Sequence, residues 1–96
     1  MRPNVRAAAV AGMFYPEDPA VLRKMVDGFF DQIRSCAPEH PPKALIVPHA
    51  GYMYSGVVAA AAYALLKPEA IKRVVMVGPS HRLFFRGLAA PESLTW

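Results

Sequence analysis

Two histidines, His49 and His81, are the residues of this sequence best suited to chemistry. Each follows a short apolar segment, residues 43–47 and 73–77 respectively, by two to four positions. If both segments are parallel strands, both imidazoles lie at the carboxyl edge of one sheet, where open α/β folds bind their ligands. Neighbouring strands are about 4.8 Å apart, so two histidines at this edge can converge on one metal ion.

Two histidines do not complete a metal site, because zinc and non-haem iron take at least a third protein ligand. Cys36 and His40 precede residues 43–47 and therefore belong to the opposite end of that strand, about 17–20 Å away. Three carboxylates stay open as ligands: Glu17, Asp18 and Glu92. The simpler expectation is that the third ligand lies outside this chain. The alternative is a pair of loop histidines that bond to backbone carbonyls and bind no metal.

Further polar and aromatic residues lie close to the two histidines. Ser80 directly precedes His81, but no nucleophile-elbow motif is present, so we expect its hydroxyl to bond the loop backbone. Four aromatic residues can line the same edge of the sheet: Phe14, Tyr15, Tyr52 and Tyr54. The first two serve equally well as core residues. The last two can donate hydrogen bonds to a substrate oxygen.

The elements that must position these residues alternate along the chain. Asp18 is a good N-cap and Pro19 suits a first helical turn, so the apolar spacing predicts a helix over about residues 19–34. Ser55 is placed to cap a second helix over residues 56–66. Four short apolar segments predict strands: residues 7–10, 43–47, 73–77 and 87–90.

The order of these elements is β-α-β-α-β, which indicates an α/β fold with an open, mainly parallel sheet. Residues 43–47 and 73–77 are apolar on both faces, and residues 56–66 form a helix that is apolar all round. Two helices cover too little of this surface. We therefore expect a single domain over residues 1–96 that is the N-terminal part of a larger three-layer α/β domain. Alternatively, a partner, such as another copy of the chain, supplies the missing cover.

The composition excludes several classes of protein. Of the 96 residues, 54% are hydrophobic and 19% are charged, which excludes intrinsic disorder as the main state. The longest apolar run, residues 57–66, is half of the roughly 20 residues that span a bilayer. The net charge is +4, but the basic residues are scattered, so we expect no nucleic-acid binding. A single cysteine and the lack of a signal-peptide segment favour the cytoplasm.

Three motifs resemble those of the Memo-like family, also called the AmmeMemoRadiSam system protein B family. They are AVAGMFYP at residues 9–16, VPHAGYMYSG at residues 47–56 and VGPSHR at residues 77–82. The motifs occur in the family's order and together span nearly the whole chain. The resemblance implies a fold similar to that of class III extradiol dioxygenases, which are non-haem iron enzymes with an α/β core.

The resemblance also implies roles for individual residues. His49 and His81 match metal-site histidines, and Phe14 and Tyr54 match positions that line the same pocket. The family's further site residues, an aspartate, another histidine and a cysteine, belong to later parts of longer chains, and Cys36 does not match that cysteine. Iron is the metal that the resemblance favours, with copper and zinc as alternatives. It suggests AMMECR1-like and radical SAM proteins of the same system as partners.

These observations predict a metal-binding protein of oxidoreductase type, in which His49 and His81 are both ligands and catalytic residues. The metal would activate dioxygen or a substrate oxygen as a Lewis acid, with Tyr54 moving protons. The candidate substrate contacts are Phe14, Tyr15, Tyr54 and Ser80. Two alternatives stay open: the pocket binds a peptide or a small anion without turnover, or the chain is an inactive, truncated fragment.

Overall fold

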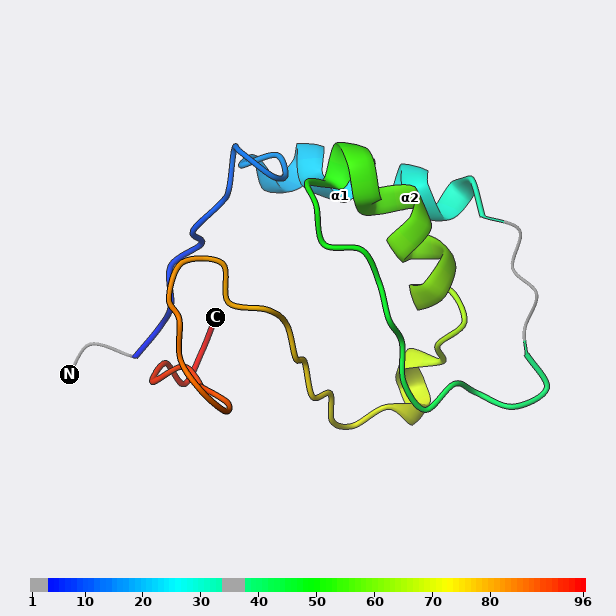
Figure 1. Ribbon diagram of the computed structural model, residues 1–96. Helices are drawn as coiled ribbons and strands as arrows, with labels where there is room; N and C mark the ends of the chain where they lie inside the picture. The colour runs from blue at the N-terminus through cyan, green and yellow to red at the C-terminus, as the bar shows by residue number, and fades with distance from the viewer. Residues whose placement is uncertain (1–3, 34–37) are drawn as a thin grey trace. The chain divides into compact units, whose positions relative to one another are not determined.

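The computed structural model describes residues 4–33 and 38–96 (Figure 1). Cys36 lies outside these described residues. The described chain contains two α-helices, α1 (Pro19–Asp31) and α2 (Tyr52–Tyr63), and a short 3-10 helix, η1 (Pro68–Ala70), that follows α2. None of these helices has the length and apolar character needed to cross a membrane.

The chain divides into two compact units. The first, Val10–Ile71, contains all three helices and is called the helical unit. The second combines Met1–Ala9 with Lys72–Trp96 and is called the terminal unit. His49 therefore belongs to the helical unit, whereas His81 belongs to the terminal unit.

The predicted α/β fold with a parallel sheet is wrong. No β-strand occurs within residues 4–33 and 38–96, where the extended pairings are two isolated bridges. One bridge joins Val5 to Thr95 and the other joins Ala11 to Tyr15. None of the four predicted strands forms: residues 7–10, 43–47, 73–77 and 87–90.

The physical reason is that an apolar segment forms a strand only where a neighbouring strand supplies its hydrogen-bond partners. A parallel strand depends on backbone hydrogen bonds to adjacent strands and on helices over both faces. Residues 43–47 and 73–77 form no such ladder, and their side chains stay largely exposed, with Ile46 at 100% and Val75 at 82%. An apolar composition that suits a buried strand does not produce one by itself.

Helix α1 begins where its sequence predicts. Asp18 is the N-cap, and its Oδ1 accepts hydrogen bonds from the backbone N–H groups of Ala20, at 2.9 Å, and Val21, at 3.0 Å. The helix ends at Asp31, before the predicted end at residue 34, and Gln32 is its C-cap. The start of this helix is therefore set by a cap within its own sequence.

Replacing Asp18 with alanine is expected to lower the free energy of unfolding by about 1 kcal/mol, because two N–H groups lose their acceptor. Asp18→Asn retains an acceptor oxygen in the same place and is the control, with most of the stability kept. Denaturant unfolding followed by circular dichroism measures both variants. An equal loss in both would mean that the charge of Asp18 near the helix dipole, and not its hydrogen bonds, stabilises α1.

Helix α2 begins earlier than its sequence predicts. Gly51 takes the N-cap position that was predicted for Ser55, and Ser55 lies in the first turn of the helix. The N–H of Tyr52 donates to the carbonyl of Phe14 at 2.7 Å, so a group from a distant loop satisfies the first N–H of the helix. This tertiary hydrogen bond explains why the helix begins at Tyr52 and not at residue 56.

Helices α1 and α2 pack against each other in the helical unit (Figure 1). At their contact Gly56 faces Phe29, and a Cβ added to Gly56 would overlap the phenyl ring. Only one face of α2 is covered. Ser55 and Ala60 are its buried residues, whereas Val58 is 62% exposed, so this helix, which is apolar all round, is only partly covered.

The terminal unit holds residues from both ends of the sequence together. The N–H of Arg6 donates to the carbonyl of Thr95 at 2.8 Å, and the N–H of Leu94 donates to the carbonyl of Asn4 at 2.9 Å. The Arg6 guanidinium lies over the Trp96 ring, 4.7 Å from its centroid. This cation–π contact adds to the backbone pairing of the two segments.

Candidate functional site

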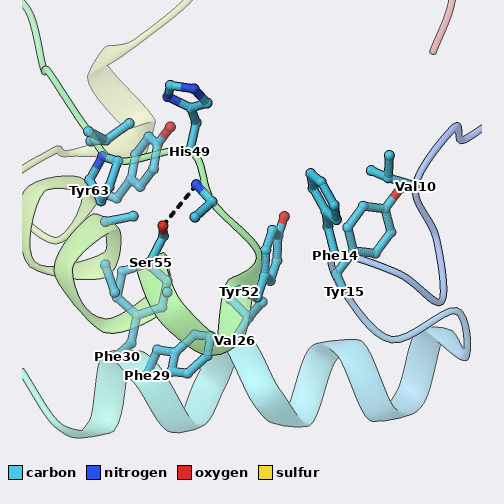
Figure 2. Close-up of a pocket in the computed structure, with 16 residues that line it drawn as sticks. Val10, Phe14, Tyr15, Val26, Phe29, Phe30, His49, Tyr52, Ser55 and Tyr63 are labelled. Atoms are coloured by element: carbon cyan, nitrogen blue, oxygen red, sulfur yellow. Dashed lines mark hydrogen bonds between the residues drawn. The ribbon is translucent and has the colours of Figure 1, made fainter. Parts of the chain in front are cut away.

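A pocket of about 400 Å³ lies within the helical unit, next to α1, α2 and the loop that precedes α2 (Figure 2). Six aromatic residues contribute to its wall: Phe14, Tyr15, Phe29, Phe30, Tyr52 and Tyr63. Apart from the tyrosines, the polar side chains of the lining are His49 and Ser55. A mostly aromatic and aliphatic wall with few polar groups is typical of a site for an apolar ligand group.

A tight turn at residues 10–15 carries Phe14 and Tyr15 to the pocket. The N–H of Phe14 donates to the carbonyl of Val10 at 2.9 Å, and the N–H of Gly12 donates to the carbonyl of Tyr15 at 2.7 Å. Gly12 has a φ of 79°, which lies in the left-handed region that glycine adopts without steric cost. The local sequence around Gly12 therefore permits the turn that presents the two aromatic rings.

The turn is attached to the beginning of α2 by two contacts with Tyr52. The first is the hydrogen bond from the Tyr52 N–H to the Phe14 carbonyl. In the second, the rings of Tyr15 and Tyr52 lie 5.3 Å apart between centroids and are tilted by 42°, a favourable aromatic arrangement (Figure 2). These contacts make one side of the pocket from segments almost forty residues apart in sequence.

His49 lies on the loop directly before α2 and lines the pocket. The next residue is held in place, because the N–H of Ala50 donates to the Oγ of Ser55 at 2.9 Å (Figure 2). Figure 2 shows the imidazole ring at the opposite end of the pocket from Phe29 and Phe30, and the side chain is exposed. An exposed imidazole at one end of an aromatic pocket can ligate a metal or exchange a proton with a bound group.

His81 lies on an exposed loop of the terminal unit. The neighbouring Ser80 donates from its Oγ to the carbonyl of Leu83 at 2.6 Å and accepts from the Leu83 N–H at 3.4 Å. The expectation that this hydroxyl bonds the loop backbone is confirmed. Because His49 and His81 belong to different units, their convergence on one metal ion stays a prediction.

No three His, Cys, Asp or Glu side chains gather as a metal-binding group within residues 4–33 and 38–96. Among the candidate third ligands, Asp18 is occupied as the cap of α1. Tyr54 is 81% exposed and does not line the pocket, whereas Tyr52 does. Two positions along a helix differ by about 200° in direction, so the two tyrosines face different sides of α2. A proton-transfer role of Tyr54 stays a prediction.

The apolar spacing of residues 19–34 predicts a helix and assigns none of its residues to a site. Val26, Phe29 and Phe30 recur at helical spacing, which correctly predicts that they share one face of α1. That face meets α2 and also forms part of the pocket wall. The spacing carries no signal for the pocket, because the empty volume depends on the distance between two helices.

Comparison with known proteins gives a family match over residues 6–96, to the Memo-like protein family. A MEMO1 family protein of Aquifex aeolicus is 42% identical in an alignment 94 residues long that covers 95% of this chain. The identity is 41% over 86 residues, or 90% of this chain, for a MEMO1 family protein of Schizosaccharomyces pombe. A third relative, a MEMO1 family protein of Methanothermobacter thermautotrophicus, is 36% identical in an alignment 99 residues long that covers 96% of this chain.

The chain spans only about a third of the length of these curated relatives, with coverages of 31%, 27% and 36% respectively. No solved structure matches the chain. The family match contains all three motifs, at residues 9–16, 47–56 and 77–82, and so confirms the resemblance drawn from them. The chain belongs to the Memo-like family.

Proposed function

We propose that this chain carries part of a metal-binding site of oxidoreductase type, related to class III extradiol dioxygenases, with His49 and His81 as two of the ligands. The observation that supports the proposal best is the place of His49, in the lining of an aromatic pocket. Imidazole nitrogen suits iron, copper and zinc, and the family resemblance favours iron. When bound, the metal supplies Lewis-acid activation of dioxygen or of a substrate oxygen.

The residues present fit such a metal only in part. Two imidazoles are fewer than the three protein ligands that zinc and non-haem iron take. Among the described residues, no three His, Cys, Asp or Glu side chains form a group that could hold a metal ion. We therefore expect weak binding by the 96-residue chain, with further ligands coming from outside the described residues.

The chain's own side chains would select and orient the substrate. Phe14, Tyr15 and Tyr52 would stack against an aromatic or aliphatic group and exclude water from it. His49, at one end of the pocket, would accept or donate a proton at a ring nitrogen. Tyr54, which lies outside the pocket lining, is the second proposed proton carrier. An apolar group with an attached oxygen function is the substrate class that this wall favours.

Anaerobic calorimetric titration of ferrous iron into the 96-residue chain tests the metal site. We expect saturable binding that weakens at least about tenfold, or about 1.4 kcal/mol, in each of the variants His49→Ala and His81→Ala. His40→Ala removes an exposed histidine outside the proposed site and is expected to bind iron like the parent chain. Circular dichroism verifies that each variant is folded. Equal losses in all three variants, or unchanged binding in the His49→Ala/His81→Ala double variant, would overturn the proposal.

A non-catalytic binding module is the second candidate function. One observation favours it: the pocket is built within the helical unit and does not depend on His81. An apolar side chain of a peptide suits the aromatic wall better than a small anion, because the few polar groups of the lining would replace only part of the anion's hydration. This function predicts a folded chain without saturable iron binding, so the same titration separates the two candidates. AMMECR1-like and radical SAM proteins remain proposed partners by family resemblance.

A further inference from the structure

We propose that Ser55 and Ser80 are positioning residues, each of which holds the loop that carries one of the two candidate metal ligands. The inference rests on the proposed function, because holding these loops matters for function only if His49 and His81 are metal ligands. Each serine is joined by its hydroxyl to loop backbone, and the two sets of hydrogen bonds lie in different units.

Ser55 fixes the loop from inside α2. Its side chain is buried, with 6% exposed, and its Oγ accepts the Ala50 N–H at 2.9 Å. The Ser55 N–H donates in turn to the Gly51 carbonyl at 3.0 Å. That second contact is the first i→i−4 bond of the helix and involves no side chain, so the Oγ alone anchors the Ala50 amide, which belongs to the peptide unit between His49 and Ala50.

The direction of the Ser55 hydrogen bond separates this role from helix capping. A capping serine lies at the N-cap and its oxygen accepts from an N–H of the following turn. Ser55 lies within α2, and its oxygen accepts from a residue that precedes the helix, whereas the N-cap Gly51 makes no side-chain hydrogen bond. The one buried polar side chain of α2 therefore orders the loop and leaves the N–H groups of the helix uncapped by side chains.

Ser80 holds the His81 loop by an independent set of contacts. Its Oγ donates to the Leu83 carbonyl at 2.6 Å and accepts from the Leu83 N–H at 3.4 Å. Both polar groups of the Leu83 peptide backbone are thus joined to one hydroxyl, which closes a turn over residues 80–83. His81 lies inside this turn, so the conformations open to its backbone are restricted.

Nuclear magnetic resonance of the metal-free chain tests the Ser55 assignment directly. In Ser55→Ala we expect the Ala50 amide to exchange with solvent at least about tenfold faster and the His49 ring signals to shift. Ser55→Thr retains the hydroxyl and is expected to restore both readouts. Ser55→Cys keeps the size with a weaker acceptor and is expected to fall between them. The His81 signals should stay unchanged in all three variants.

The converse variant, Ser80→Ala, is expected to shift the His81 ring signals and leave those of His49 in place. Ser93→Ala, which removes a hydroxyl elsewhere in the terminal unit, should shift neither histidine. Unchanged ring signals in Ser55→Ala and Ser80→Ala would overturn the proposal. If Ser55→Ala does not fold, identical spectra of Ser55→Cys and the parent chain would overturn it instead.

Because these readouts need no metal, they separate the positioning role from the metal site. Shifted histidine signals with no iron binding in the parent chain would argue against the proposed function and retain the positioning role. If iron binds, its affinity should fall in Ser55→Ala and recover in Ser55→Thr. If the parent chain binds iron and Ser55→Ala binds it equally tightly, the positioning role of Ser55 is contradicted although the metal site is real.

Discussion

Alanine in place of Gly56 is expected to destabilise the chain, whereas alanine in place of Gly28 is expected to stabilise it. Both glycines lie inside helices, where alanine is favoured by roughly 0.5–1 kcal/mol. A Cβ at Gly28 meets nothing within 4 Å, so no steric cost opposes the gain in helix stability from alanine. At Gly56 the Cβ would overlap the ring of Phe29, and overpacking of this kind costs roughly 1–3 kcal/mol.

Urea unfolding of the two variants should therefore give changes of opposite sign in the free energy of unfolding. A double variant identifies the cause. In Phe29→Ala the obstructing ring is removed, so adding Gly56→Ala to it should cost less than Gly56→Ala costs alone. Two outcomes would mean that Gly56 does not make room for the Phe29 ring. One is a change of the same sign in the free energy of unfolding at Gly28 and Gly56, and the other is full additivity of Gly56→Ala with Phe29→Ala.

The Gly56 contact also connects stability to the candidate site. Phe29 contributes to the pocket wall, and its ring end is the part that a new Cβ would displace. A displaced ring changes the shape of the pocket even where the helix remains folded. We therefore expect Gly56→Ala to alter ligand binding in the pocket as well as stability, whereas Gly28→Ala should alter neither the ring nor the pocket.

Valine in place of Gly12 is expected to disrupt the turn that carries Phe14 and Tyr15. The φ of 79° at Gly12 lies in the left-handed region, where an ordinary residue costs roughly 1–2 kcal/mol and a β-branched residue costs more. Space does not limit the addition of a Cβ, because the nearest atom to it is the Oε2 of Glu17, at 3.7 Å. The loss therefore comes from backbone strain.

A series at Gly12 distinguishes strain from crowding. Asparagine tolerates the left-handed region, so the losses of stability should rank Asn, then Ala, then Val, from smallest to largest. The nuclear Overhauser contacts between the Tyr15 and Tyr52 rings should weaken in the same order. Gly78→Ala is the control, since Gly78 has no positive φ and no atom lies within 4 Å of its Cβ. An asparagine variant as damaged as valine would point to contact with Glu17.

Features that depend on a few adjacent residues were predictable from the sequence. Asp18 caps α1 through N–H groups two and three positions away, and Ser80 bonds a backbone group three positions away. Such contacts form within one turn of chain and need no partner from elsewhere. The motifs are equally local, so the family followed from residues 9–16, 47–56 and 77–82 alone.

The beginning of α2 was not predictable for the opposite reason. Ser55 reads as a cap in sequence, but the helix begins at Tyr52, whose N–H is satisfied by the carbonyl of Phe14. That acceptor lies almost forty residues earlier in the chain. With the cap no longer needed, the Ser55 hydroxyl is available to bind the Ala50 N–H. One tertiary hydrogen bond thus changed both the boundary of the helix and the role of the serine.

The sheet failed as a prediction because strands depend on partners even more strongly than helices do. Residues 73–77 have the apolar, β-branched composition of a buried strand, yet Val75 and Val77 are 82% and 80% exposed. A helix closes its hydrogen bonds within one segment, whereas a strand closes them only with another. Composition alone therefore determines that these residues are apolar, and tertiary structure decides whether they pair.

The same division holds for the candidate site. The sequence by itself determined that the chain has imidazoles at positions 49 and 81 and that it belongs to the Memo-like family. The pocket beside His49 was decided by tertiary structure, because its wall joins Phe14, Phe29 and Tyr52 from three separate segments. An enclosed apolar surface is a property of the distances between such segments, and those distances follow from packing and long-range hydrogen bonds.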